Sequence, residues 1–106
     1  MPAYVVDLKA DMRWIKLVEK LKTKLLKRFN GEVLKIVALY SPEDRLYDSN
    51  VLVVVREDSA EVVEGVIKAA LEAEEEMGLE GVISPLVVGP EERRIIEGFE
   101  GFEVVC

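Results

Sequence analysis

The 106-residue sequence contains no histidine, no glutamine, one threonine and one cysteine, Cys106, at its last position. Without histidine the chain lacks the commonest general base and the commonest zinc ligand, which disfavours hydrolytic triads and ordinary zinc sites. A single cysteine excludes a disulfide framework within one chain. No apolar run approaches the roughly 20 residues of a membrane span, and the first residues lack the basic-then-apolar order of a secretory signal. We therefore expect a cytoplasmic protein without a membrane segment.

Half of the residues are apolar and a third are charged. A chain of this length is expected to form one domain over residues 1–106, and its apolar content favours a packed core over disorder. The high charged fraction fits a heat-loving source. Residues 1–36 carry nine basic and four acidic side chains, whereas residues 37–106 carry five basic and seventeen acidic ones. This split predicts two binding surfaces, or two surfaces that face each other.

The first predicted helix runs from about Ala10 to Phe29, after a short strand or lead-in at Tyr4–Leu8. Its apolar residues recur at steps of three and four; they are Trp14, Ile15, Leu17, Val18, Leu21, Leu25, Leu26 and Phe29. The opposite face is basic and carries Arg13, Lys16, Lys20, Lys24 and Lys27. Asn30 and Gly31 are expected to end the helix, because glycine readily adopts the left-handed conformation.

Two further helices are expected. The second begins near Ser59, with Asp58 or Ser59 as its N-cap, and ends at Gly78. Its expected buried face consists of Val62, Val63, Val66, Ile67, Ala70 and Leu71. The third helix is short; it starts at Pro90, since proline is favoured as a first helical residue, and closes near Gly98.

Val33–Leu39 and Val51–Val55 are short, nearly continuous apolar runs, typical of strands buried on both faces. The residues between them form a loop. A third strand is expected at Val82–Val88, where Pro85 removes a ladder donor and predicts an edge or bulged strand. A fourth is expected at Phe102–Val105. The order α-β-β-α-β-α-β predicts an α/β (α+β) fold, with a small mixed sheet of about four strands and helices packed on it.

The loop has an informative layout, because one apolar run ends at Tyr40-Ser41 and the next opens with Ser49-Asn50-Val51-Leu52. With the element order and the ending "RRIIEGFEGFEVV", this layout resembles the minimal nucleotidyltransferase domain of the DNA polymerase β superfamily, from Trp14 to the end. In that family a strand ends in a Gly-Ser turn, and the next strand opens with Asp, an apolar residue and a second Asp. Those carboxylates and a third from a later strand hold two Mg²⁺ ions.

This sequence departs from the family pattern at most of these positions. The turn glycine falls on Tyr40, the first aspartate on Asn50 and the second on Leu52, and the 82–88 run contains no acid. Only Ser41 keeps the residue of the family. Asparagine is a neutral, poorer ligand for Mg²⁺ and leucine is none. We therefore expect a degenerate member with no catalytic residue, no metal site and no cofactor.

Three functions follow as hypotheses. The first is a non-catalytic binding or assembly module, for which the family implies a small helical partner, as in toxin–antitoxin pairs; self-association is the other option. The second is an active enzyme that transfers a nucleoside monophosphate from Mg-ATP, with a shifted register that pairs Asp48 with Asn50 near the loop acids Glu43 and Asp44. The third is a nucleic-acid-binding module that uses the basic face of the first helix.

Two other features have open interpretations. The acidic cluster Glu72, Glu74, Glu75 and Glu76 lies at a helix C-terminus, where the helix dipole disfavours negative charge. It indicates either a binding surface or a solubilising one. Tyr40 and Tyr47 bracket the loop, and we expect them to fill the former nucleotide cleft.

Overall fold

The computed structural model describes the backbone of residues 2–100 and 103–104 and the side chains of residues 12–100. Its elements, in chain order, are α1 (Pro2–Arg28), β1 (Val33–Ala38), β2 (Val51–Val55), α2 (Ala60–Glu76), β3 (Pro85–Val88), α3 (Arg93–Phe99) and β4 (Glu103–Val104). The chain is thus an α+β protein in which helices pack on a small mixed sheet. Cys106, and the outer residues of the last predicted strand, Phe102 and Val105, lie outside the described residues.

The sheet has the strand order β3-β2-β1-β4. β1 and β2 are antiparallel, β2 and β3 are parallel, and the two residues of β4 pair antiparallel with the end of β1. All five residues of β2 are buried, as their continuous apolar run predicts. Pro85 begins β3 at the edge of the sheet, which confirms the edge prediction. The strand is shorter than expected, because residues 82–84 do not join the ladder.

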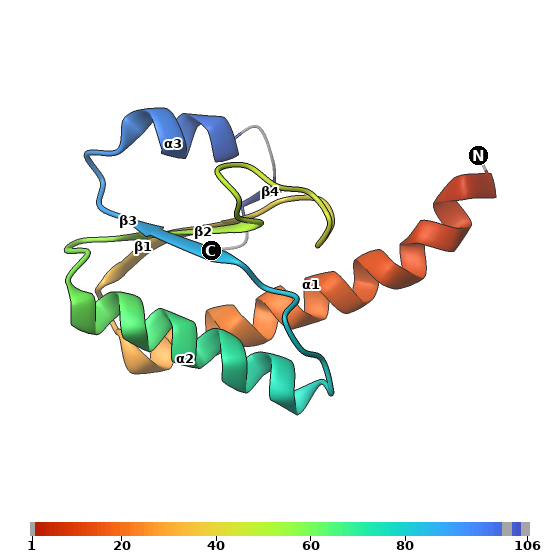
Figure 1. Ribbon diagram of the computed structural model, residues 1–106, viewed down its shortest axis with the longest axis horizontal. Coiled ribbons are helices and arrows are strands. Elements are labelled where there is room, and N and C mark those ends of the chain that lie inside the picture. The colour runs from red at the N-terminus through yellow and green to blue at the C-terminus, as the bar shows by residue number, and fades with distance from the viewer. Residues whose placement is uncertain (1, 101–102, 105–106) are drawn as a thin grey trace.

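The sheet separates two apolar clusters, with helices on both of its faces (Figure 1). α1 and α2 cover one face, and the cluster there includes Trp14, Leu17, Leu21, Val53 and Val66. The short helix α3 lies on the opposite face, over a smaller cluster of Val37, Leu39, Leu52, Val54, Val88 and Phe99. The side chains of β2 alternate between the two clusters, so this strand is the centre of both.

Helix α1 is longer than predicted, because residues 4–8 are helical and neither a strand nor a lead-in. Pro2 suits the first helical turn, and no glycine or proline interrupts residues 3–30. Its 27 residues correspond to about 40 Å, and its N-terminal end extends beyond the rest of the domain (Figure 1). No helix in the described ranges combines the length and apolar character needed to cross a membrane.

Helix α2 begins and ends as expected. Ser59 is its N-cap, with the hydroxyl accepting from the N–H of Val62 at 3.3 Å, and Gly78 follows its end with a φ of +67°. The predicted buried face is wrong at two positions, since Ile67 and Leu71 are 46% and 59% exposed. The sheet covers a narrower stripe of Val62, Gly65, Val66, Ala69, Ala70 and Ala73, which leaves the flank of the helix beside β3 open.

Helix α3 starts at Arg93, three residues later than the predicted Pro90. Before it, the N–H of Glu92 bonds to the carbonyl of Gly89 at 3.3 Å, so a turn closes first. The helix runs one residue past Gly98 to Phe99, whose side chain is fully buried. Burial of this ring in the smaller cluster explains the later end.

Candidate functional site

The loop between β1 and β2 closes with a tight two-residue turn. Leu46 and Ser49 exchange backbone hydrogen bonds of 2.8 and 3.0 Å. Tyr47 and Asp48, between them, have φ values of +54° and +60°. A turn with two positive φ angles normally contains Asn-Gly, and other residues are strained there by roughly 1 kcal/mol each. Asp48 is therefore an exposed residue at the tip of a strained turn.

Asn50 is fully buried at the start of β2, and its side chain is bonded on both sides. The amide nitrogen donates to the carbonyls of Pro42 at 3.0 Å and Val82 at 2.8 Å. The amide oxygen accepts from the N–H of Ser84 at 2.9 Å. Both N–H donors are thus used, and an aspartate would direct a carboxylate at two carbonyl oxygens. Asn50, which the sequence resemblance aligns with a metal ligand, joins two loops here.

Glu74, in the last turn of α2, is the second buried polar residue at this place. One carboxylate oxygen accepts from the N–H groups of Val82 and Ile83, at 2.6 Å each. Together with Asn50 it binds three successive backbone donors, those of residues 82–84. We call this arrangement of Asn50, Glu74 and residues 82–84 the clamp. The sequence interpretation of the acidic cluster missed it, although Glu74 lies four residues after Ala70, on the buried side of the helix.

Leu52, at the position of the second family aspartate, is fully buried in the cluster under α3. Its partner in the parallel register of β3 is Leu86, which packs against the same cluster. Apolar side chains therefore occupy these two neighbouring strand positions. In the part of the chain whose side chains are described, no three His, Cys, Asp or Glu residues are grouped so that they could hold a metal ion.

The remaining loop positions are placed as follows. Ser41 is partly buried, and its carbonyl accepts from the N–H of Asp44 at 3.2 Å. Tyr40 and Tyr47 are 61% and 54% exposed. With more than half of each side chain exposed, they do not fill a cleft as expected. Glu43 and Asp44 are exposed.

A cavity of about 350 Å³ opens beside the clamp, between α1, the loop and residues 79–82. Its walls are largely apolar, with Trp14, Leu17 and Val82 among them, and Arg13 and Arg45 add positive charge. The indole N–H of Trp14 already donates to Leu39 at 2.8 Å. Among the described side chains, no buried nitrogen or oxygen lacks a hydrogen-bond partner. The cavity therefore has no unpaired buried polar group to orient a ligand, and its charged lining residues Arg13, Glu43 and Arg45 are exposed.

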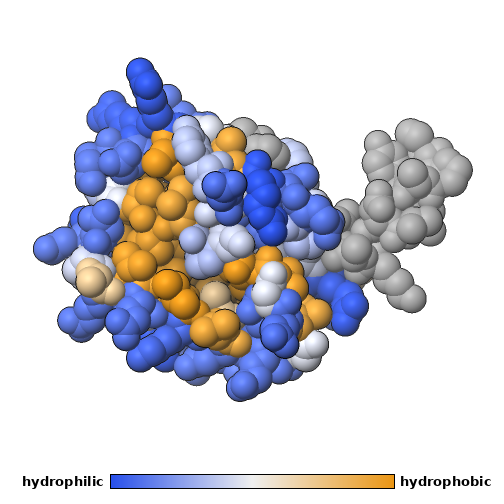
Figure 2. Space-filling model, viewed as in Figure 1, coloured by the Kyte–Doolittle hydropathy of each residue, from blue (hydrophilic) through white to orange (hydrophobic). Residues whose placement is uncertain are grey.

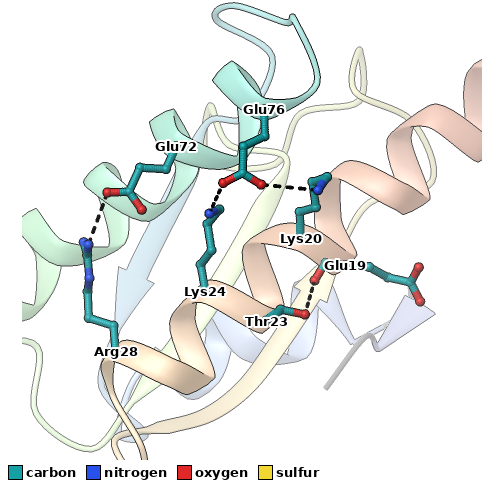
Figure 3. A network of polar contacts seen from close by, with 7 residues as sticks. All are labelled: Glu19, Lys20, Thr23, Lys24, Arg28, Glu72 and Glu76. Atoms are coloured by element: carbon teal, nitrogen blue, oxygen red, sulfur yellow. Dashed lines mark hydrogen bonds and ion pairs between the residues drawn. The ribbon is translucent and has the colours of Figure 1, made fainter.

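The predicted basic face of α1 lies partly against the acidic cluster of α2 (Figure 3). Lys24 and Lys20 both bind the carboxylate of Glu76, the latter at 3.3 Å. Arg28 binds Glu72 at 3.2 Å and the carbonyl of Gly65 at 3.3 Å. The Lys24 ammonium, and then that of Lys20, hold the pKa of the Glu76 carboxyl below its ordinary value.

The other members of that face are exposed. Lys16 and Lys27 border a hollow that Lys20, Lys24 and Glu76 share, while Arg13 lies farther along at the cavity beside the clamp. Since Glu76 occupies the middle of the basic hollow, two of the five expected phosphate-binding residues already have an anionic partner. The arrangement weakens the hypothesis of nucleic-acid binding.

Comparisons with protein-family models, with curated proteins and with solved structures found no match to this chain.

Proposed function

We propose that this chain is a nucleotidyltransferase-like domain that has lost its catalytic carboxylates and acts as a binding or assembly module. The proposal includes the order α-β-β-α-β-α-β around a small mixed sheet of about four strands. It is supported by the placement of the loop between two central antiparallel strands, next to a parallel third strand.

The bonding of Asn50 is the single observation that carries the non-catalytic part of the proposal. A metal-binding residue presents free oxygen lone pairs to solvent or substrate. The Asn50 side chain is fully buried, and its donors and acceptor are directed at the loop and at residues 82–84. Asp48, the alternative ligand, lies at the tip of the turn. Two anionic ligands for a metal pair therefore do not converge.

The test is a nucleotide-binding and transfer assay on the full chain. We expect isothermal titration with Mg-ATP and Mg-GTP to give no measurable heat of binding, and α-phosphate-labelled nucleotides with Mg²⁺ or Mn²⁺ to label no protein or RNA acceptor. Asp48→Ala should behave as the parent does, with Glu43→Ala as its matched loop control. Metal-dependent labelling that Asp48→Ala abolishes and Glu43→Ala retains would establish the active enzyme instead.

The assembly part of the proposal needs a protein partner, either a small helical protein or a second copy of this chain. The helical partner rests on analogy of fold alone. It is tested by co-expression with a small helical protein encoded beside this chain, followed by sedimentation of the purified complex. We expect a stable complex of defined stoichiometry with this helical protein.

A further inference from the structure

The outer edge of the sheet is apolar and uncovered. β3 is paired with β2 on one side only. Viewed from the side of β3, the surface has a band of apolar residues that runs from this strand on to α2 (Figure 2). We call this band the edge patch; it consists of the exposed Ile67 and Leu71 and the partly exposed Val63, Pro85, Leu86 and Val87. An open apolar edge strand is a template for pairing with another strand.

The register shows which backbone groups of β3 are available. Val51 lies opposite Pro85 in the parallel ladder. In such a ladder one of two opposed residues bonds to both neighbours of the other. Pro85 has no N–H, so Val51 is the residue of this pair that bonds to β3, through Leu86, while the carbonyl of Ser84 accepts from the N–H of Asn50 at 3.1 Å. The strand alternates, and the N–H and C=O of Val87, with the C=O of Pro85, therefore point away from the sheet.

We propose that two copies of this chain pair through this edge, with β3 antiparallel to β3 of the second copy and Val87 opposite Val87. Each Val87 would then donate to and accept from the other. Gly89 is buried in its own chain, so the Val87 pair would supply the hydrogen bonds of the contact. The two-fold axis would be perpendicular to the sheet, so both α2 helices lie on the same face and meet through Ile67 and Leu71. Such an interface is closed and self-complementary.

Two observations favour a second copy over an unrelated strand. The missing N–H of Pro85 would face the carbonyl of Gly89, which already accepts from Glu92 in its own chain. The missing hydrogen bond at Pro85 thus leaves no carbonyl group without a donor. In addition, a chain with a net charge of −7 repels itself, but two of the acids of α2 point away from this flank, and Glu64 pairs with Lys68 at 3.6 Å. Glu72 and Glu76 face α1 instead.

This inference names the protein partner for the proposed function, and it rests on that function for the biological role of the dimer. Its test is separate, because sedimentation reports on pairing and the nucleotide assays report on catalysis. A dimer that also transfers nucleotides would overturn only the proposed function. A monomer that transfers none would overturn only the pairing.

The experiment is sedimentation equilibrium of the full chain from micromolar to about millimolar concentration. We expect a monomer–dimer equilibrium in the parent. Ile67→Lys with Leu71→Lys should weaken dimerisation by about tenfold or more. Val87→Pro removes an N–H that points away from β2, and it should abolish the dimer while leaving the circular dichroism spectrum of the monomer unchanged. Met12→Lys is the matched control, since Met12 is an equally exposed apolar residue, on α1; it should leave dimerisation intact.

Several outcomes would overturn the pairing. One is a parent that stays monomeric up to about millimolar concentration, including one that instead binds an extended peptide at this edge. Another is a dimer that the double lysine variant leaves unchanged. A third is a dimer that Met12→Lys dissociates, because contact would then run through α1. The double lysine variant decides the question even if Val87→Pro fails to fold.

Discussion

Residues 82–84 and residues 85–88 are adjacent in the chain, yet their backbone groups are satisfied in opposite ways. The N–H groups of Val82, Ile83 and Ser84 all bond to the buried side chains of Glu74 and Asn50. In β3, alternate backbone groups face solvent beside an apolar surface. Buried polar groups that are fully paired make a position structural, whereas open ones make it available to a partner. The proposed interaction therefore lies at the sheet edge, whereas the clamp at residues 82–84 is structural.

The largest effect is expected when the hydrogen bonds of the clamp are broken. Glu74→Ala leaves two buried N–H groups without an acceptor, and we expect the free energy of unfolding to fall by about 3 kcal/mol or more. Glu74→Gln keeps an acceptor oxygen and should lose roughly half as much. Urea unfolding at constant m value measures both. Equal losses in the two variants would show that the hydrogen bonds to Val82 and Ile83 are not what stabilises the segment.

Asn50→Asp tests the clamp by replacing one atom, the side-chain nitrogen, with oxygen. A carboxylate there faces the carbonyls of Pro42 and Val82, so we expect a loss of about 2 to 3 kcal/mol at neutral pH. The folded state would raise the pKa of the new carboxyl above its unfolded value. The loss should therefore be full at high pH and shrink as the pH falls and the carboxyl becomes protonated. Unfolding curves across this pH range, with Asn50→Ala as the pH-independent control, measure the effect. A loss that does not vary with pH would contradict it.

The exposed flank of α2 should tolerate substitutions in the monomer. Ile67→Lys and Leu71→Lys alter side chains that are about half exposed, so each should change the monomer's free energy of unfolding by less than about 0.5 kcal/mol. Chemical unfolding at dilute concentration, where dimers are absent, is the measurement. Val66→Lys, on the buried stripe of the same helix, is the contrasting control and should unfold the protein. Losses near 2 kcal/mol at Ile67 would mean that this flank is packed within one chain.

The smallest effect concerns the exposed ion pairs of Glu76. Its lowered pKa means that the pairing stabilises the fold above the unfolded pKa, and that this contribution is lost as the pH falls through the folded pKa. Lys24→Met should raise the pKa of Glu76 more than Lys20→Met does, because the Lys24 hydrogen bond is the larger cause. Carbon-detected NMR titration of the Glu76 carboxyl measures this. The reverse order would contradict the assignment.

Local signals predicted much of the secondary structure. Ser59 caps α2, and Gly31 and Gly78 have the positive φ angles expected at helix ends. The five-residue run of β2 was predicted residue for residue, because continuous β-branched sequence leaves few alternatives. Pro85 marked an edge strand, since its missing donor is incompatible with a central one.

The misses came from contacts that no local pattern contains. Ile67 and Leu71 continue the apolar period of α2, but the sheet ends at β3 and leaves them exposed. Glu74 stood within an acidic run, and only the approach of residues 82–84 makes it a buried acceptor. The arrangement of Asn50 was equally hidden, because the sequence indicated only that asparagine is a poor ligand for Mg²⁺ and could not indicate its three hydrogen-bond partners.

The clamp also determines which part of the fold we expect to open first. It ties the end of α2 to the start of β3, so an opening of the clamp would release the edge strand before the rest of the sheet. β2 would then become the new edge, and all five of its residues are apolar and have no charge to deter pairing. Loss of the hydrogen bonds that Glu74 accepts would thus let β3 open locally and expose β2. We expect the resulting species to be prone to aggregation well below the temperature of global unfolding.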